Sequence, residues 1–470
     1  MSVLEMRVLD RGEMERLHQA TLQVFENPGV RIPNPAILAK LAAAGALVDE
    51  VNQIVRFPRE MVAERLAVAP PVARMTGLNG KILETGSGNR YYHSLILDPW
   101  ITDFEHGPRR PVLEDVRRHT ILGDALDRVS GMMRMQYPVA DMPEPQCYWK
   151  TMEIFLCHTT KHVAMYPTDL ANALDWIGAG EILAGSAGLK KTPLYTVAVA
   201  ISSPLTLNPV NGDLLELAIE YNQPVISTVC PMAGSTSPYT LAGTMLISNA
   251  EALLPVIVAQ VLAPGHPVLY AIGPSVTDLR SGHDLYYKAE KTLFKLMGVQ
   301  MGRFYNLPVA GETAGATTWR LDVQNGAEGM LYLLAAVAAG QHMFGGLGSN
   351  YNAVGMSAEQ ILLQCGMVDQ AEYVARGVSL DDHQLGLESI RAAGPGGHYL
   401  ADDLTIEYMR SDQFFRTPHF DYAGDHRPSA GASAMAHEKV EEIVRSHKPA
   451  VPDSVQQELM TYFGRKIESV

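Results

Sequence analysis

The sequence predicts an α/β protein built on a closed (β/α)8 barrel of the TIM type, with an N-terminal α+β cap and a C-terminal helical extension. After residue 114, short β-rich runs alternate with helical stretches, the pattern of parallel strands joined by crossover helices. The middle of the chain supplies the roughly 250 residues that an eight-stranded barrel takes. Turn residues and small polar residues follow one strand candidate after another, which is how this fold builds a site at the carboxyl ends of its strands.

Seven strands have clear signals: residues 131–137, 162–166, 194–201, 224–230, 268–272, 307–311 and 341–345. Helices are expected between them, and the eighth strand must come either from residues 92–97 or from a weak segment after Val374. An open doubly wound sheet is the structural alternative. We prefer the barrel because the strand ends share a chemistry, as in Ser202-Ser203-Pro204 and Gly311-Glu312-Thr313.

Three regions follow from this pattern. Residues 1–112 hold two short helices and Gly-punctuated hairpins, and form the predicted cap. Residues 113–378 form the predicted catalytic barrel. Residues 379–470 form a helical extension interrupted by the turn Gly394-Pro395-Gly396-Gly397, which we expect to pack across the barrel or on a symmetry mate.

Composition excludes several classes of protein. The formal net charge of −14, with no basic stripe, argues against a nucleic acid as the main partner. Hydrophobic residues make up 47% and charged residues 19%, which excludes disorder for most of the chain and suggests a large core or a buried subunit interface, so a homo-oligomer is expected. No dinucleotide, Walker or nucleophile-elbow motif occurs in the sequence.

The expected location is the cytoplasm. The charged N-terminus does not resemble a secretory signal, and the most apolar stretches are too short or too interrupted by proline to span a bilayer. The four cysteines show no Cys-x-x-Cys spacing, so we expect free thiols, and we assign no metal site.

Several segments, taken in their order along the chain, resemble the trimethylamine methyltransferase family of corrinoid-dependent enzymes. They are residues 311–348 (GETAGATTWRLDVQNGAEGMLYLLAAVAAGQHMFGGLG), the turn 394–400 (GPGGHYL), the opening helix that ends in Gly29-Val30-Arg31, and the hairpin region before Leu97. The resemblance therefore spans nearly the whole chain. It implies a barrel enzyme that gives a methyl group to the cob(I)alamin of a separate corrinoid protein, with no cofactor bound tightly by this chain.

The founding members of that family carry a pyrrolysine in the stretch that corresponds to residues 322–328 here. It aligns most naturally with Asn325, next to Gln324, and neither pyrrolysine nor lysine occurs in this stretch. The chain therefore resembles the non-pyrrolysine branch, whose described members demethylate quaternary amines such as glycine betaine; proline betaine and carnitine belong to the same chemical class. A quaternary amine leaves as a neutral tertiary amine, so positioning and exclusion of water would be sufficient.

The substrate class that the resemblance implies, a cation with a carboxylate, requires aromatic faces for the cation and hydrogen-bond donors for the carboxylate. Aromatic faces attract quaternary ammonium groups. The aromatic candidates are Trp319, Phe344, Tyr351, Tyr166 and Tyr195, and Tyr137 and Tyr270 are further candidates. Arg320 and His342 are candidate carboxylate donors. Glu312 is predicted to end a strand, where it either faces the cation or has a structural role, capping the following turn or pairing with Arg320. Catalytic roles are assigned to Glu312, Asn325 and Gln324.

A Gly-rich loop preceding a helix can cradle an anion with its N–H groups. On that basis the backbone amides of residues 345–349 are candidate donors to the substrate carboxylate, beside Arg320 and His342. Gly345, Gly346, Gly348 and Ser349 are also assigned to the side of the site that meets the cofactor. Close packing of strand against helix is the equally weighted alternative for Gly345-Gly346.

Two other functions stay open from the sequence. One is a barrel lyase or hydrolase for a small carboxylate, in which Glu312 and His342 act as acid and base. The other is a non-catalytic quaternary-amine binding protein that kept the pocket and lost the chemistry.

Overall fold

The computed structural model describes residues 4–422 and 430–469, and its centre is a closed barrel of eight parallel strands. In order around the barrel these are β6 (Tyr91–Leu95), β9 (Val129–Met135), β10 (His162–Tyr166), β11 (Tyr195–Ala200), β12 (Val225–Thr228), β14 (Val268–Ala271), β17 (Val309–Glu312) and β18 (Met343–Leu347), with β18 pairing back to β6. The predicted (β/α)8 fold is confirmed, and the open-sheet alternative is wrong because the sheet has no edge.

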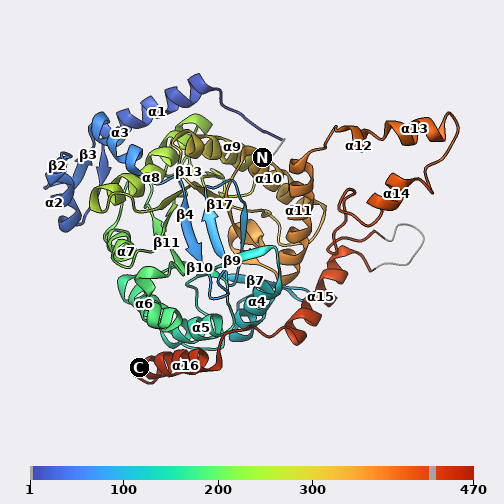
Figure 1. Cartoon of the computed structure of the whole chain (residues 1–470). Coiled ribbons are helices and arrows are strands. Elements are labelled where there is room, and N and C mark those ends of the chain that lie inside the picture. The colour runs from blue at the N-terminus through green and yellow to red at the C-terminus, as the bar shows by residue number, and fades with distance from the viewer. Residues whose placement is uncertain (1–3, 423–429, 470) are drawn as a thin grey trace.

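Each barrel strand is followed by a helix that covers the outside of the barrel (Figure 1). These helices are α4 (Leu113–Ala125), α5 (Gln146–Cys157), α6 (Leu170–Ala184), α7 (Pro209–Glu220), α8 (Leu241–Leu262), α9 (Ala289–Phe304), α10 (Val323–Ala339) and α11 (Ala358–Arg376). Helix α8 is long and apolar enough to cross a membrane, but 78% of its apolar window is buried inside the molecule. It is therefore accounted for as a core helix of the barrel.

The eighth strand is β6, the first of the two candidates. It lies inside residues 1–112, so the segment predicted as a cap gives one strand to the barrel, and residue 112 does not mark where the barrel begins. The sequence predicts two alternatives for residues 91–97, a hairpin and a barrel strand. Tyr91–Leu95 instead pairs in parallel with β18 and β9.

The rest of the N-terminal region is a small α+β unit whose helices pack against α8 and α9, followed by a hairpin whose Ala73, Met75 and Leu83 pack with the inner side chains of the barrel. It comprises α1 (Arg11–Glu26), β1 (Val30–Arg31), α2 (Pro35–Ala43), β2 (Leu47–Asp49), β3 (Ile54–Arg56), α3 (Arg59–Val68), and the hairpin β4 (Ala73–Thr76) with β5 (Ile82–Thr85). Asp10 begins α1 with a reciprocal capping box to Glu13.

Short strands at the barrel mouth join loops that are distant in sequence. One sheet contains β7 (Trp100–Asp103), β8 (Gly107–Arg109), β19 (Ser349–Asn350) and β20 (Gly355–Met356). A second contains β13 (Met232–Ala233), β15 (Ser275–Thr277) and β16 (Asp284–Leu285). These sheets hold the loops that follow β6, β12, β14 and β18.

The C-terminal region has two parts that differ in packing. Helices α15 (Ala432–Ser446) and α16 (Asp453–Glu468) pack on the barrel, α15 against α4 and α11 and α16 against α5 and α6. The short helices α12 (Asp382–Leu385), α13 (Leu387–Ala393) and α14 (Asp403–Tyr408) form an arm that projects from the barrel (Figure 1). Val378 and Leu400 on this arm are 83% and 84% exposed, so the arm does not pack across its own barrel.

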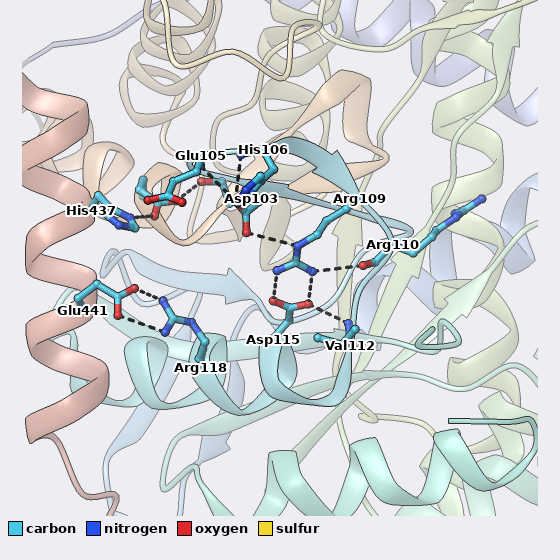
Figure 2. A network of polar contacts seen from close by, with 12 residues as sticks. Asp103, Glu105, His106, Arg109, Arg110, Val112, Asp115, Arg118, His437 and Glu441 are labelled. Atoms are coloured by element: carbon cyan, nitrogen blue, oxygen red, sulfur yellow. Dashed lines mark hydrogen bonds and ion pairs between the residues drawn. The ribbon is translucent and has the colours of Figure 1, made fainter. Parts of the chain in front are cut away.

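Charged contacts tie α15 to the barrel (Figure 2). Arg118 of α4 pairs with Glu441, and His437 contacts Glu359 at 2.8 Å. Beside them, Arg109 of β8 donates two hydrogen bonds to Asp115 of α4, at 2.7 and 2.8 Å, which fixes the β7–β8 hairpin over the start of α4.

Candidate active site

A cavity of about 300 Å³ opens at the carboxyl ends of the barrel strands. Its apolar wall comes from strands β6, β9, β12, β14 and β18, and is formed by Leu95, Met133, Met135, Ile226, Val229, Ala271, Ile272 and Met343. Three tyrosines, Tyr166, Tyr286 and Tyr287, add aromatic surface. The mixture of an apolar wall and a few polar groups is typical of a small-molecule site.

Glu312, at the end of β17, is the most heavily bonded acid in this cavity. Lys291 and Lys295 of α9 place their Nζ atoms 3.2 and 3.1 Å from its two carboxylate oxygens. The hydroxyl of Tyr332 donates to it at 2.8 Å, and the hydroxyl of Tyr286 donates to its other oxygen. Burial alone would raise the pKa of Glu312, but the lysines and the hydroxyl donors outweigh it and hold that pKa well below its usual range.

The two lysines are positioned by helical spacing. Residues four apart lie on one face of a helix, and α9 turns this face toward the barrel, so that Lys291 and Lys295 are each 3% exposed. The Nζ of Lys291 also lies 3.2 Å from the centre of the Tyr286 ring. Burial lowers the pKa of both lysines, and the carboxylate of Glu312 opposes that shift. Neither lysine is part of the cavity wall, whereas their contact residues Glu312 and Tyr286 are.

Several predicted site residues do line the cavity. Glu312, Tyr166, Gly345, Gly346 and Ser349 lie on its wall. The expected pairing of Glu312 with Arg320 is wrong, because its partners are the two lysines of α9. Gly348 lies just outside the wall, where its N–H donates to Gln364 at 2.7 Å.

Four predicted residues point outward from the barrel, so their assignment to the substrate is wrong. Successive residues of a strand face opposite sides, and Met343 and Ala198 face the barrel interior. Phe344 therefore packs outward, stacked on Tyr92 at 4.7 Å. Tyr195 packs outward against Trp176, and Tyr270 donates outward to Asn249. His342 lies at the amino end of its strand and accepts a hydrogen bond from the N–H of Val309 at 3.0 Å.

The remaining predicted residues lie on the rim and do not line the cavity. Asn325 is buried between α10 and α11 and accepts a hydrogen bond from Gln360 at 2.7 Å, while Gln324 is exposed and donates to Glu328. Trp319 lies against the β7–β8 turn at Gly107, with the exposed Arg320 over its ring. Tyr351 packs at an angle on Trp100.

The polar residues of this site and its support that the sequence did not reveal include Asp98, Asp284, Tyr286, Lys291 and Lys295. The spacing of the two lysines within an apolar helix was a usable signal, because buried lysines need a partner. Asp98-Pro99 directly after a strand was another. Among the described residues, no three His, Cys, Asp or Glu side chains gather closely enough to hold a metal ion.

Comparison with known proteins decides the family. The profile described as trimethylamine methyltransferase (MTTB) matches residues 2–470. The chain belongs to the trimethylamine methyltransferase family.

Curated relatives of this family cover most of the chain. The trimethylamine methyltransferase MttB of Desulfitobacterium hafniense is 26% identical over 411 residues, which is 85% of this chain and 81% of that protein. The trimethylamine methyltransferase MttB of Methanosarcina thermophila is 25% identical, over 95% of this chain and 94% of that protein. The glycine betaine methyltransferase of Desulfitobacterium hafniense is 23% identical, over 98% of each chain.

A solved structure of similar fold is the Methanosarcina barkeri monomethylamine methyltransferase (MtmB). It aligns with a TM-score of 0.54 and 14% identity, over 99% of this chain and 88% of that chain. The likeness supports the barrel fold. Together with the named relatives, membership in the trimethylamine methyltransferase family supports methyl transfer from a methylated amine as the activity.

Proposed function

We propose that this protein is a corrinoid-dependent methyltransferase that moves a methyl group from a quaternary amine to cob(I)alamin on a separate corrinoid protein. The observation that carries the proposal is the cavity at the mouth of the barrel, in a chain of the trimethylamine methyltransferase family. Its wall combines tyrosine rings with carboxylates and apolar side chains, a surface suited to a methylated cation. Glycine betaine, proline betaine and carnitine are the substrates suggested by the resemblance.

The chain's own residues would bind and orient the amine. The tyrosine rings attract the cation, and the methionine and leucine side chains exclude water from the methyl group. When docked at the open mouth, the reduced corrinoid would supply the nucleophile that accepts the methyl group. The cavity suits this arrangement because it lies at the carboxyl ends of the strands, where the barrel is open to a partner.

No group on the cavity wall needs to act as a general acid in this reaction. A quaternary amine leaves as a neutral tertiary amine, so no proton has to be delivered. Glu312 is held ionised by its two lysines, so its role is to support the wall beside the substrate. Asn325 and Gln324 then remain rim residues without a contact to the substrate.

The lyase or hydrolase alternative finds no support in the geometry. It needs Glu312 and His342 as an acid–base pair, whereas Glu312 faces the cavity and His342 lies at the amino end of β18, pointing outward. A non-catalytic binding protein differs from the proposed enzyme only in lacking turnover, so an activity measurement separates the two.

The test is anaerobic incubation of the protein with cob(I)alamin and a panel of glycine betaine, proline betaine, carnitine, choline and trimethylamine. Methylation of cobalt is followed by absorbance. We expect methylcobalamin from at least one quaternary amine and none from trimethylamine. No transfer from any of them, also with a cognate corrinoid protein present, would overturn the proposal.

A further inference from the structure

The charges around the cavity are unequal. Three carboxylates line it, Asp98, Asp284 and Glu312, and no Lys, Arg or His is found among the described residues of its wall. Glu312 is neutralised from behind by Lys291 and Lys295. Burial raises the pKa of Asp284, and the nearby charge of Lys291 opposes part of that rise. The carboxylate without any such compensation is Asp98.

Asp98 is buried and has no partner within the part of the chain that the structure describes. It follows the end of β6, is 4% exposed, and makes no hydrogen bond or ion pair there. Its ionisable neighbours are Tyr137 and Tyr287, which are uncharged near neutral pH. Burial and the nearby Asp98 raise the pKa of Tyr137 to about 12, and burial, with Glu312 and then Asp98, raises that of Tyr287 further.

A buried carboxylate without a partner is costly to a folded protein, and such groups concentrate at binding sites. Burial raises the pKa of Asp98 well above its usual range, which is the signature of that cost. A ligand that brought a positive charge into the cavity would remove the cost. The wall beside Asp98 is apolar and aromatic, with Leu95 and Tyr287 lining the same cavity, so a cation surrounded by methyl groups fits it better than a hydrated ion.

We propose that Asp98 is the counter-ion of the substrate's quaternary ammonium. The substrate then lacks the carboxylate of a betaine and carries a net positive charge, as choline does. This inference rests on the proposed function: it keeps a quaternary amine as the substrate, but disfavours the betaines that the resemblance suggests. A betaine would place its carboxylate in a cavity that already holds Asp284 and Glu312 and whose described wall offers no cationic side chain. Of the donors expected for that carboxylate, Arg320 and His342 lie off the wall. Gly345, Gly346 and Ser349 do line it, but their backbone amides carry no positive charge to offset the three carboxylates.

Choline and glycine betaine make a matched pair of probes, because they differ at one end by an alcohol or a carboxylate. Isothermal titration calorimetry on the full chain would measure binding of choline chloride, tetramethylammonium chloride and glycine betaine at constant ionic strength. We expect choline to bind at least about tenfold more tightly than glycine betaine, since the carboxylate of glycine betaine is repelled by the cavity carboxylates and the neutral alcohol of choline is not. This comparison uses the unaltered protein, so it does not depend on the folding of a variant.

Asp98→Asn removes the charge and keeps the shape. We expect it to weaken choline binding about tenfold or more while changing glycine betaine binding much less. Asp284→Asn is the matched control, a second cavity carboxylate whose charge is partly offset by Lys291, and it should have a smaller effect on choline. Thermal unfolding of each variant checks that the fold is kept.

Two results would overturn the inference. One is glycine betaine binding as tightly as choline, and the other is unchanged choline binding by a folded Asp98→Asn protein. Failure of the wild-type protein to bind choline and tetramethylammonium would also overturn the inference. Methyl transfer is measured separately. Transfer from glycine betaine that is unchanged by Asp98→Asn would support the proposed function and contradict the role of Asp98. Choline binding that depends on Asp98, without any methyl transfer, would contradict the proposed function and support Asp98 as the counter-ion.

Discussion

The carboxyl ends of β17 and β6 present two acids to one cavity, in opposite electrostatic settings. Glu312 after β17 receives two lysines and two tyrosine hydroxyls, and its pKa falls. Asp98 after β6 has no described partner, and its pKa rises. A satisfied acid belongs to the framework of the site, whereas an unsatisfied acid is available to a ligand. The difference shows that burial alone does not tell which residue binds.

The largest test of this difference is Glu312→Gln. Removing the carboxylate leaves two buried lysines without a counter-charge, which should lower the free energy of unfolding by about 3–5 kcal/mol. Urea unfolding followed by circular dichroism measures this. The double variant Glu312→Gln with Lys295→Met should recover part of the loss. A loss below about 1 kcal/mol would mean that the lysines are not held by Glu312.

Asp98→Asn, in contrast, should raise the free energy of unfolding of the protein without ligand. The folded pKa of Asp98 lies above the unfolded value, so wild-type stability falls as pH rises from the unfolded pKa toward the folded one. The variant lacks this loss, by about 1.4 kcal/mol for each unit of the shift. We expect it to be more stable than wild type near pH 8 and nearly equal near pH 3.

Urea unfolding at several pH values measures this gap. Burial raises the pKa of Glu251 to about 7, so ionisation of Glu251 also lowers protein stability over this pH range. Both proteins contain Glu251, so its effect cancels in the difference between them. A gap that stays constant with pH would show that Asp98 is ionised with the same ease in the folded and unfolded chain.

The sequence was sufficient for the fold because alternating strands and helices limit the topology strongly. The seven strand signals all correspond to barrel strands, and one of the two candidates for the eighth is β6. The facing of each strand was harder to predict, because strands of a parallel barrel are apolar on both faces. Phe344 and Tyr195 were therefore assigned to the cavity although both face the helices.

The site could be predicted only where a polar residue ends a strand. Glu312, Tyr166 and the Gly345-Gly346 pair meet that condition and line the cavity. The partners of Glu312 come from α9, and no local pattern tells which helix turns its lysines toward which acid. Asp98 was overlooked because its lack of a partner is a property of the three-dimensional arrangement.

A smaller effect is expected at Tyr166, whose ring lines the cavity. Tyr166→Leu removes an aromatic face and should weaken choline binding by about 0.5–2 kcal/mol, the range of one cation–π contact. Tyr166→Phe is the matched control, since it keeps the ring, and should bind choline within about twofold of wild type. Calorimetry measures both. Equal losses in the two variants would assign the effect to the hydroxyl and not to the ring.

The smallest effect on the ligand is expected from His342→Leu. His342 faces away from the cavity, so choline affinity should stay within about twofold of wild type, as expected for a side chain that does not contact the ligand. Stability of the His342→Leu protein near pH 8 should fall by about 1 kcal/mol, because the Val309 N–H loses its acceptor.

Burial, with Arg303 and Arg90, lowers the pKa of His342 to about 4, so wild-type stability falls as pH drops from about 6.5 toward 4. The variant lacks that loss, and the gap between the two proteins should narrow in urea unfolding at pH 5. A large loss of choline binding would place His342 in the site and remove the contrast between the cavity and the outer face of its strands.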